Sequence, residues 1–246
     1  RAAFPVVVIG AGMSGLLAGV RLREAGIPFT IVEKNPAPGG TWYENTYPGA
    51  RVDVGNHFYC YSFEPADHWS EFFARQPALQ AYFQRVLYHL ELGAHIRWES
   101  DVTGARWDEV RNACTVQVRA ADGTTDQLEG RALISAVGQL NRPKLPDIPG
   151  RDSFAGPSFH SAQWDHSVDY EGKRVVVIGS GATAVTLVPA MAEKTAHITM
   201  LQRSPTYMAA RPDQDVIANN LRKVLPDQVA YNLTRYKNAQ LGELFY

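Results

Sequence analysis

The sequence has 246 residues, of which 45% are hydrophobic and 20% are charged, a ratio typical of one large or two modest globular domains. Its 24 lysines and arginines nearly balance 25 acids, and the net charge of -1 provides no global field for nucleic acid or an anionic bilayer. The two distant cysteines, Cys60 and Cys114, exclude a disulfide scaffold, a cysteine zinc site and a dithiol redox centre.

The N-terminal stretch superficially resembles a targeting segment. Residues 4–20 contain no charged side chain, but this length is at the short limit for a bilayer span, and it holds four glycines. We therefore interpret it as a soluble strand, turn and helix, and we expect a cytoplasmic protein. Because the chain begins at Arg1 and stops at Tyr246 within a predicted helix, we also expect it to be part of a longer polypeptide.

The first elements predict one βαβ unit. Residues 5–9 are a short β-branched run, typical of a buried parallel strand. Residues 13–25 have helical spacing and are followed by Gly26, and residues 29–32 predict a second strand that ends at Glu33.

A long irregular stretch and a small sheet follow. Residues 35–63 are rich in Gly, Pro, Asn and aromatics without a regular period, and a long ordered loop of this kind is more often functional than not. Residues 67–92 predict a helix that is broken near Pro77. Three alternating segments then predict an antiparallel meander, and a further buried strand follows: 102–107, 114–119, 125–129 and 131–137.

The second half repeats the βαβ pattern. Residues 141–172 predict a linker with four prolines. Strand, helix and strand are then expected at 174–178, 182–192 and 197–201, and amphipathic helices after Pro212.

The first strand-to-helix turn is a G-x-G-x-x-G motif made by Gly10, Gly12 and Gly15. Such glycines permit a tight turn, the close approach of a pyrophosphate and the packing of the helix on the sheet. Glu33 lies 18 residues after Gly15, where a carboxylate accepts ribose hydroxyls. This favours a dinucleotide without a 2′-phosphate, FAD or NAD.

The second turn is a G-x-G-x-x-A motif in the same context, over Gly179, Ser180, Gly181, Ala182, Thr183 and Ala184. Here the next strand ends in Arg203 and Ser204 rather than in an acid, which suits the 2′-phosphate of NADP. One such motif alone is a weak signal, since a glycine-rich packing turn has the same pattern. Two in context, with opposite ribose chemistry, predict a flavin enzyme that NADPH reduces.

Two further stretches carry a family resemblance. Gly39, Gly40, Thr41 and Trp42, followed by Tyr47-Pro48-Gly49 and Asp53, match G-G-x-W-x-x-x-x-[FY]-P-[GM]-x-x-x-D. The second stretch matches F-x-G-x-x-x-H-x-x-x-W-[PD] through Phe154, Gly156, His160, Trp164 and Asp165. The chain thus resembles Baeyer–Villiger monooxygenases, a branch of the class B flavoprotein monooxygenases. Residues 56–59 and 202–205 are most similar to the 4-hydroxyacetophenone monooxygenase group.

The resemblance implies a reaction in which NADPH reduces FAD and one oxygen atom of O2 is inserted next to a ketone carbonyl. The product is an ester or lactone, with water. The implied partners are a small ketone and O2, without nucleic acid or a membrane, and no metal. The sequence predicts neither the ketone, nor the regiochemistry, nor the oligomeric state.

The resemblance also implies residue roles. Asp53 is the candidate catalytic residue, beside the flavin and oriented to pair with an arginine. Arg51 is expected on the nicotinamide side. The other implied cofactor residues are, for FAD, Gly10, Gly12, Ser14, Gly15, Glu33, Gly40, Thr41, Trp42, Tyr59 and the backbone of Val102, and for NADP, Ser180 to Thr186, Arg203 and Ser204.

The expected fold class is α/β, with two Rossmann-like dinucleotide-binding domains, a small antiparallel β meander and the start of a helical insertion. The expected division is an FAD-binding domain at 1–140, a linker with the fingerprint at 141–172, an NADP-binding domain at 173–211 and the insertion at 212–246. The active-site arginine of the family lies beyond that insertion. We therefore expect residues 1–246 alone to be poorly active or inactive.

Alternatives remain for several features. A flavin-containing monooxygenase that oxidises N or S atoms is the second candidate, although Trp164-Asp165 argues against it. A non-catalytic NADP-sensing module is the third, although the aromatic loop argues against that. Trp42, Tyr43 and Tyr47 are alternatively core aromatics, His160 a structural hydrogen-bonding group, and Asp53 a turn cap.

Overall fold

The computed structural model describes residues 4–66, 69–208 and 211–243, and it forms two compact units. Unit 1 comprises residues Arg1–Glu44 and Leu79–Ile148. Unit 2 comprises residues Asn45–Ala78 and Pro149–Tyr246. Residues 45–78, which we expected in the FAD-binding domain, thus pack with unit 2. The assignment of each segment to a cofactor stays a prediction.

Unit 1 is built on a four-stranded parallel sheet with the order β3-β2-β1-β7. The β-branched runs form the strands because both faces of the sheet are covered. Val6 at the start of β1 pairs with Phe29 on one side and with Ala132 on the other. The strands are β1 (Val6–Ile9), β2 (Phe29–Val32), β3 (Ile96–Arg97) and β7 (Ala132–Ser135).

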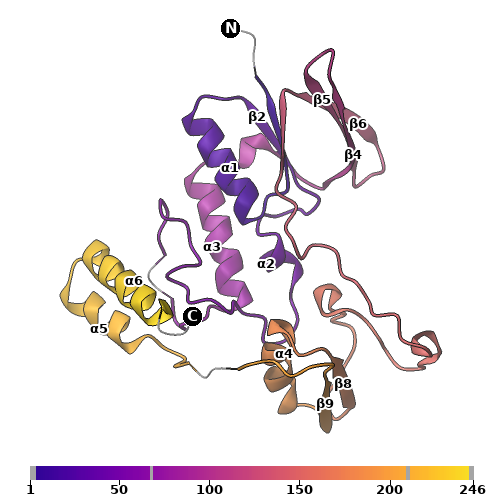
Figure 1. The fold of residues 1–246 in the computed structure, drawn as a ribbon, viewed down its shortest axis with the longest axis vertical. Coiled ribbons are helices and arrows are strands. Elements are labelled where there is room, and N and C mark those ends of the chain that lie inside the picture. Colours follow the sequence, from indigo (N-terminus) through magenta and orange to yellow (C-terminus); the bar gives the residue numbers. More distant parts are fainter. Residues whose placement is uncertain (1–3, 67–68, 209–210, 244–246) are drawn as a thin grey trace. The chain divides into compact units, whose positions relative to one another are not determined.

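Helices cover one face of this sheet and the predicted meander covers the other (Figure 1). The helices are α1 (Met13–Glu24) and α3 (Gln76–His89). The meander consists of β4 (Ser100–Asp108), β5 (Ala113–Ala120) and β6 (Thr125–Gly130), and alternate residues of β5 pack against the sheet. The resulting core contains Val7, Val32, Cys114, Val116 and Val118.

The helix predicted at 67–92 is shorter than expected. Asp67 lies outside the described residues, residues 69–75 are irregular, and α3 begins at Gln76. Pro77 is therefore the second residue of the helix and does not break it, because a proline in the first turn removes an N–H that would lack an intrahelical partner anyway. The loop predicted at 35–63 contains one helical turn, α2 (Thr41–Glu44).

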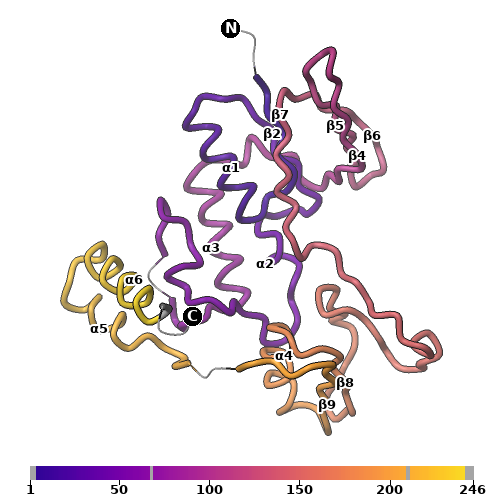
Figure 2. The backbone as a smooth tube through the Cα atoms, in the orientation of Figure 1, coloured from indigo at the N-terminus to yellow at the C-terminus, as the bar shows by residue number. Residues whose placement is uncertain are grey.

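Unit 2 contains the second βαβ segment at the predicted residues. The strands β8 (Arg174–Ile178) and β9 (His197–Leu201) are parallel, and α4 (Ala182–Ala192) connects them. Val175, Val177 and Ile198 pack under α4 against its buried Leu187 and Met191. Figure 2 traces the irregular, looping backbone that precedes β8, with the short helices η2 (Arg151–Ser153) and η3 (Ser161–Gln163).

The predicted helices after Pro212 are α5 (Val216–Val224) and α6 (Asp227–Glu243). Their buried positions are small or polar rather than the expected aliphatic ones: Ala218, Ala230, Tyr231, Thr234 and Asn238. Two apolar side chains of α5, Val216 and Val224, are instead 61% and 77% exposed. Within the described ranges, no helix has the length and apolar character needed to cross a bilayer.

Candidate active site

The first glycine turn joins β1 directly to α1. Gly12 precedes the helix without a side-chain cap, so the N–H groups of the first helical turn are not bonded by a capping side chain. A Cβ on Gly15 would lie 1.7 Å from the carbonyl oxygen of Gly10, so only glycine lets the helix start this close to the strand. Ser14 is exposed in the first turn. This is the geometry that helix N-termini offer to a phosphate.

Glu33 at the end of β2 faces this turn, as predicted. Its Oε2 accepts the N–H of Ala11 at 2.6 Å, and its Oε1 accepts the N–H of Asn35 at 2.8 Å. The residue is only 4% exposed. Because each carboxylate oxygen has a second lone pair, the fixed carboxylate can still accept hydroxyl donors such as those of a ribose.

An open cavity of about 350 Å³ has Lys34, the residue after Glu33, in its lining. Its volume is within the usual range for small-molecule sites. Val102 adjoins the lining residue Asp101 and is half-buried against the meander core. Neither Glu33 nor Val102 lines the cavity, and the predicted contact of Val102 with adenine stays a prediction. The lining residues are Lys34, Glu99, Asp101, Arg119, Ala120, Ala121 and Gly123.

The first fingerprint begins against the glycine turn in unit 1. The N–H of Gly39 donates to the carbonyl of Ala11 at 3.1 Å, and the Gly40 carbonyl accepts the N–H of Tyr43 at 3.0 Å, which helps to close α2. Thr41 is exposed and Trp42 is 8% exposed. Both predicted flavin-lining residues lie in the turn that the Gly39 bond attaches to the first glycine motif.

Two residues that hold this turn were not predicted. Glu44 accepts a hydrogen bond from Asn35 Nδ2 at 3.0 Å and pairs with Lys34 Nζ at 2.8 Å. Gln80 of α3 donates from Nε2 to the carbonyl of Pro38 at 2.8 Å. Neither belongs to a motif, and no spacing in the sequence marks them. Glu44 connects α2 to the residues that directly follow Glu33, and Gln80 connects α3 to the segment before α2.

The rest of the fingerprint belongs to unit 2 and packs on α4. Tyr47 is buried against Leu187 and Met191, and Trp164 of the second fingerprint packs on the same cluster. Gly49 has φ +77°, and a Cβ there would lie 2.4 Å from the carbonyl oxygen of Thr186. The core-aromatic alternative is therefore correct for Tyr47. The two fingerprints meet on the helix of the second βαβ segment.

His160 makes a structural hydrogen bond, as the simpler alternative predicted. Its Nδ1 accepts the N–H of Ala162 at 3.1 Å and caps η3. The neighbouring Asp165 accepts hydrogen bonds from the hydroxyl and N–H of Ser167, which lower the pKa of that carboxyl. Both residues fix the local backbone before β8.

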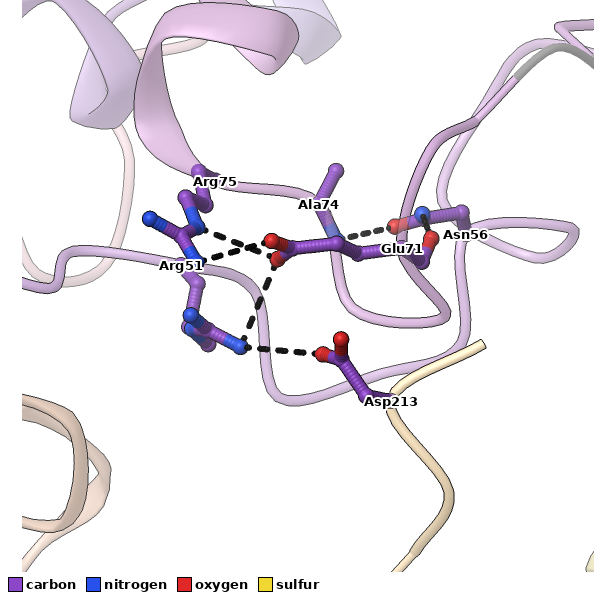
Figure 3. Close-up of polar contacts among 6 residues, drawn as sticks. All are labelled: Arg51, Asn56, Glu71, Ala74, Arg75 and Asp213. Carbon is purple, nitrogen blue, oxygen red and sulfur yellow. Dashed lines mark hydrogen bonds and ion pairs between the residues drawn. The ribbon is translucent and has the colours of Figure 1, made fainter. Parts of the chain in front are cut away.

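The candidate catalytic residue Asp53 is exposed, and among the described residues its carboxylate makes no ion pair or capping bond. Arg51, two residues earlier, is held by carboxylates (Figure 3). Its Nη1 lies 3.5 Å from Glu71 Oε2 and 3.9 Å from Asp213 Oδ1. Tyr59, half-buried, follows in the same loop. The roles of these residues toward a cofactor stay predictions.

The second glycine turn brings its predicted residues together. Ser180 Oγ lies 3.0 Å from Thr206 Oγ1 and 3.4 Å from the carbonyl of Ser204, which ties the turn to the segment after β9. Gly181 precedes α4 without a side-chain cap, and Ala184 is buried. An open cavity of about 520 Å³ lies over the strand ends, lined by Ile178, Gly179, Ser180, Leu201, Gln202, Arg203 and Ser204. The cation and the hydroxyl group thus share one cavity with the turn.

No group of three His, Cys, Asp or Glu side chains that could hold a metal ion occurs in the part of the chain that the structure describes. The two thiols, Cys60 and Cys114, are free, and Cys114 is buried.

Known proteins similar to this chain include flavin- and NADP-binding enzymes. The model of the pyridine nucleotide-disulphide oxidoreductase family matches residues 7–243. The chain belongs to this family. A Baeyer–Villiger monooxygenase of Streptomyces coelicolor is 40% identical over 212 residues, which cover 86% of this chain and 40% of the relative.

Solved structures of monooxygenases are similar to this chain over most of its length. An OTEMO complex with FAD and NADP is similar with a TM-score of 0.78 at 35% identity, covering 90% of this chain and 43% of that one. Cyclohexanone monooxygenase from Rhodococcus sp. Phi1, bound to NADP+, has a TM-score of 0.78 at 32% identity, covering 90% and 42%.

These relatives confirm the resemblance to Baeyer–Villiger monooxygenases and the predicted fold class, α/β with two Rossmann-like segments. The chain spans less than half the length of the curated relatives and solved structures reported above. The closer placement in the 4-hydroxyacetophenone monooxygenase group stays a prediction.

Proposed function

We propose that this chain supplies the FAD-binding site and part of the NADPH-binding site of a Baeyer–Villiger monooxygenase. We refer to each of these two binding sites as a cradle. The reaction inserts one oxygen atom of O2 next to the carbonyl of a small ketone and gives an ester or lactone. The curated relative with 40% identity carries that name, and similar solved structures hold FAD and NADP. We propose a cytoplasmic enzyme without nucleic acid or a membrane as partner.

One contrast carries the proposal. A buried carboxylate, Glu33, faces the first glycine turn, and a guanidinium, Arg203, lines the cavity of the second. A carboxylate accepts ribose hydroxyls and repels a 2′-phosphate, whereas a guanidinium binds that phosphate. The two cradles therefore select different dinucleotides, as an enzyme needs when NADPH reduces a bound flavin.

The residues of the chain bind and orient these groups. Gly10, Gly12 and Ser14 would hold the FAD pyrophosphate with the first N–H groups of α1, and Glu33 the adenosine ribose. Ser180, Arg203 and Ser204 would hold the NADPH phosphates. FAD, when bound, supplies hydride acceptance and oxygen chemistry that amino-acid side chains lack. The fingerprint turn with Thr41 and Trp42 would cover the flavin and exclude water.

Two alternatives predict different products. An N- or S-oxygenating flavin monooxygenase would share both cradles, and an NADP-sensing module would need only the second. The bond from Gly39 to Ala11, which holds the turn with Thr41 and Trp42 beside the first glycine motif, supports a flavin site over a sensor.

The test uses the protein at the length at which it is naturally expressed. It is incubated with NADPH, 18O2 and a panel of cyclic and aryl ketones, and the products are analysed by mass spectrometry. We expect an ester or lactone that carries one labelled oxygen. Labelled amine oxides or sulfoxides from amine and sulfide substrates, with no ester, would establish the second candidate. A colourless protein that does not consume NADPH would refute the proposal in favour of a sensor.

A further inference from the structure

Two arginines face each other across a short antiparallel pairing in unit 2. Arg51 and Arg75 form the bridge. The N–H of Val52 donates to the carbonyl of Ala74 at 3.0 Å, and the N–H of Gln76 donates to the carbonyl of Ala50 at 2.8 Å. Like charges directly opposite in such a pair repel each other. This pairing therefore requires a counter-charge.

The carboxylate of Glu71 supplies that charge to both guanidinium groups (Figure 3). Its Oε1 lies 2.8 Å from Arg75 Nη2, and Arg75 Nε donates to Oε2 at 3.2 Å. The same Oε2 lies 3.5 Å from Arg51 Nη1. The side chain of Glu71 is only 16% exposed, so its interactions are less screened than those of a surface pair. Glu71 thus bridges the two strands of the pairing.

Asn56 anchors the other end of the same span. Its Nδ2 donates to the carbonyl of Glu71 at 2.6 Å, and the N–H of Ala74 donates to its Oδ1 at 2.7 Å. The residue is fully buried. Only residues 53–55 lie between this anchor and the paired Val52, and a Cβ on Gly55 would meet the Phe72 ring at 2.9 Å. Asp53 therefore lies in a short span that is anchored at both ends.

We propose that Glu71 is a positioning residue for the monooxygenase reaction. By pairing with Arg51 and Arg75 together, with Asp213 as a second carboxylate near Arg51, it fixes the span 51–56 and with it the direction of Asp53. The role in the reaction rests on the proposed function, whereas the role in fixing the span does not. Glu71 acts through the loop and needs no contact with substrate or cofactor.

The test compares three variants of the naturally expressed protein. Glu71→Gln keeps the shape but leaves two opposed guanidinium groups with only the more distant Asp213, 3.9 Å from Arg51 Nη1, as a counter-charge. We expect amide hydrogen exchange at Val52 and Gln76 to rise about tenfold, which corresponds to about 1.4 kcal/mol. We expect flavin reduction at saturating NADPH to slow by about tenfold, with FAD content unchanged. Glu71→Gln/Arg75→Gln leaves a single guanidinium and is expected to restore most of both values.

Glu24→Gln is the matched control, since it removes a carboxylate that pairs with Arg21 at 2.7 Å on the exposed face of α1. It should leave exchange and reduction unchanged. Unaltered exchange in Glu71→Gln would overturn the structural claim. Faster exchange with unaltered reduction would overturn the role in the reaction, and a double variant no better than Glu71→Gln would overturn the charge-balance explanation. If NADPH does not reduce the wild-type flavin, the proposed function fails, while the exchange data still decide whether Glu71 fixes the span.

Discussion

The carboxylate of Glu33 accepts the backbone N–H of Ala11 at 2.6 Å, although 22 residues separate them. This bond fastens the end of β2 to the glycine turn that follows β1. Since Gly39 also bonds to Ala11, the turn, the acid and the first fingerprint form one connected cradle. The acid that we propose to bind the ribose is therefore held in place by the fold itself.

Replacement of this acid tests the first cradle. Glu33→Gln places an amide in a buried site where two backbone N–H groups need acceptors. Because hydrogen bonds to a charged acceptor contribute about 1.5–3 kcal/mol, we expect FAD affinity to fall about tenfold to a hundredfold. Titration of the apoprotein with FAD, followed by flavin fluorescence, measures this. Unchanged affinity would mean that Glu33 only shapes the turn.

Arg203 determines the coenzyme preference in this account. Arg203→Ala removes the guanidinium from the cavity over β8 and β9. We expect the Kd for NADPH to rise at least about tenfold and that for NADH to stay within about twofold, because only NADPH has the 2′-phosphate. Calorimetric titration of both coenzymes measures this. Arg174→Ala, at the opposite end of β8, is the control, and an equal loss for both coenzymes would contradict the assignment.

Gly49 tests the packing of the fingerprint on α4. Gly49→Ala forces a left-handed conformation on alanine and places its Cβ 2.4 Å from the Thr186 carbonyl oxygen. Strain and overpacking of this kind each cost about 1–3 kcal/mol, so we expect a clear fall in the free energy of unfolding. Gly172→Ala is the matched control because its φ is +64° with no atom near the added Cβ. Equal losses in urea unfolding of both variants would show that the α4 contact contributes nothing.

The regular elements could be predicted because local pattern determines them. The strand Phe29–Val32 and the helix Ala182–Ala192 agree with the prediction to the residue, since a β-branched run and a glycine turn mark their ends. The start of α3 could not be placed from apolar spacing, because the decision depended on whether Pro77 opens or interrupts the helix. The start of α3 is determined by where the first helical turn can accept a proline, and the spacing of apolar residues does not show this.

Residues of the candidate site could be predicted from the sequence only where they belong to a motif with a fixed spacing. Glu33 follows its glycines at a fixed spacing, so its position was predictable. Glu44 and Glu71 bond to residues brought close by the path of irregular loops, and no spacing rule describes that path. For the same reason the polar buried face of α6, with Thr234 and Asn238, was missed: its partners lie in the loop near His57.

Asp215 links α5 to α6 and predicts a pH dependence. It caps α5 through the N–H of Ala218 at 3.0 Å and accepts Lys237 Nζ at 2.6 Å. Burial acts to raise the pKa of Asp215, but the hydrogen bonds from Lys237 and Ala218 outweigh it and lower this pKa below its ordinary value. The stabilisation is then complete above the unfolded-state pKa of about 4, and it is lost as the pH falls through the lower folded-state value.

Asp215→Asn keeps a good cap residue and removes the ion pair. We expect it to lower the free energy of unfolding by about 1 kcal/mol near neutral pH, and by progressively less as the pH falls below about 4. Urea unfolding followed by circular dichroism over a pH series measures this. Asp152→Asn, at an 87% exposed carboxylate, should change nothing. A difference that is the same at acidic and neutral pH would contradict the ion-pair explanation.

The most direct test of the two-cradle account is anaerobic rapid mixing of the naturally expressed protein with NADPH and, separately, with NADH. The account predicts that NADPH bleaches the visible absorbance of a bound flavin and saturates at a concentration at least about tenfold lower than NADH. A protein without bound flavin, or one that both coenzymes reduce with equal affinity, would contradict it.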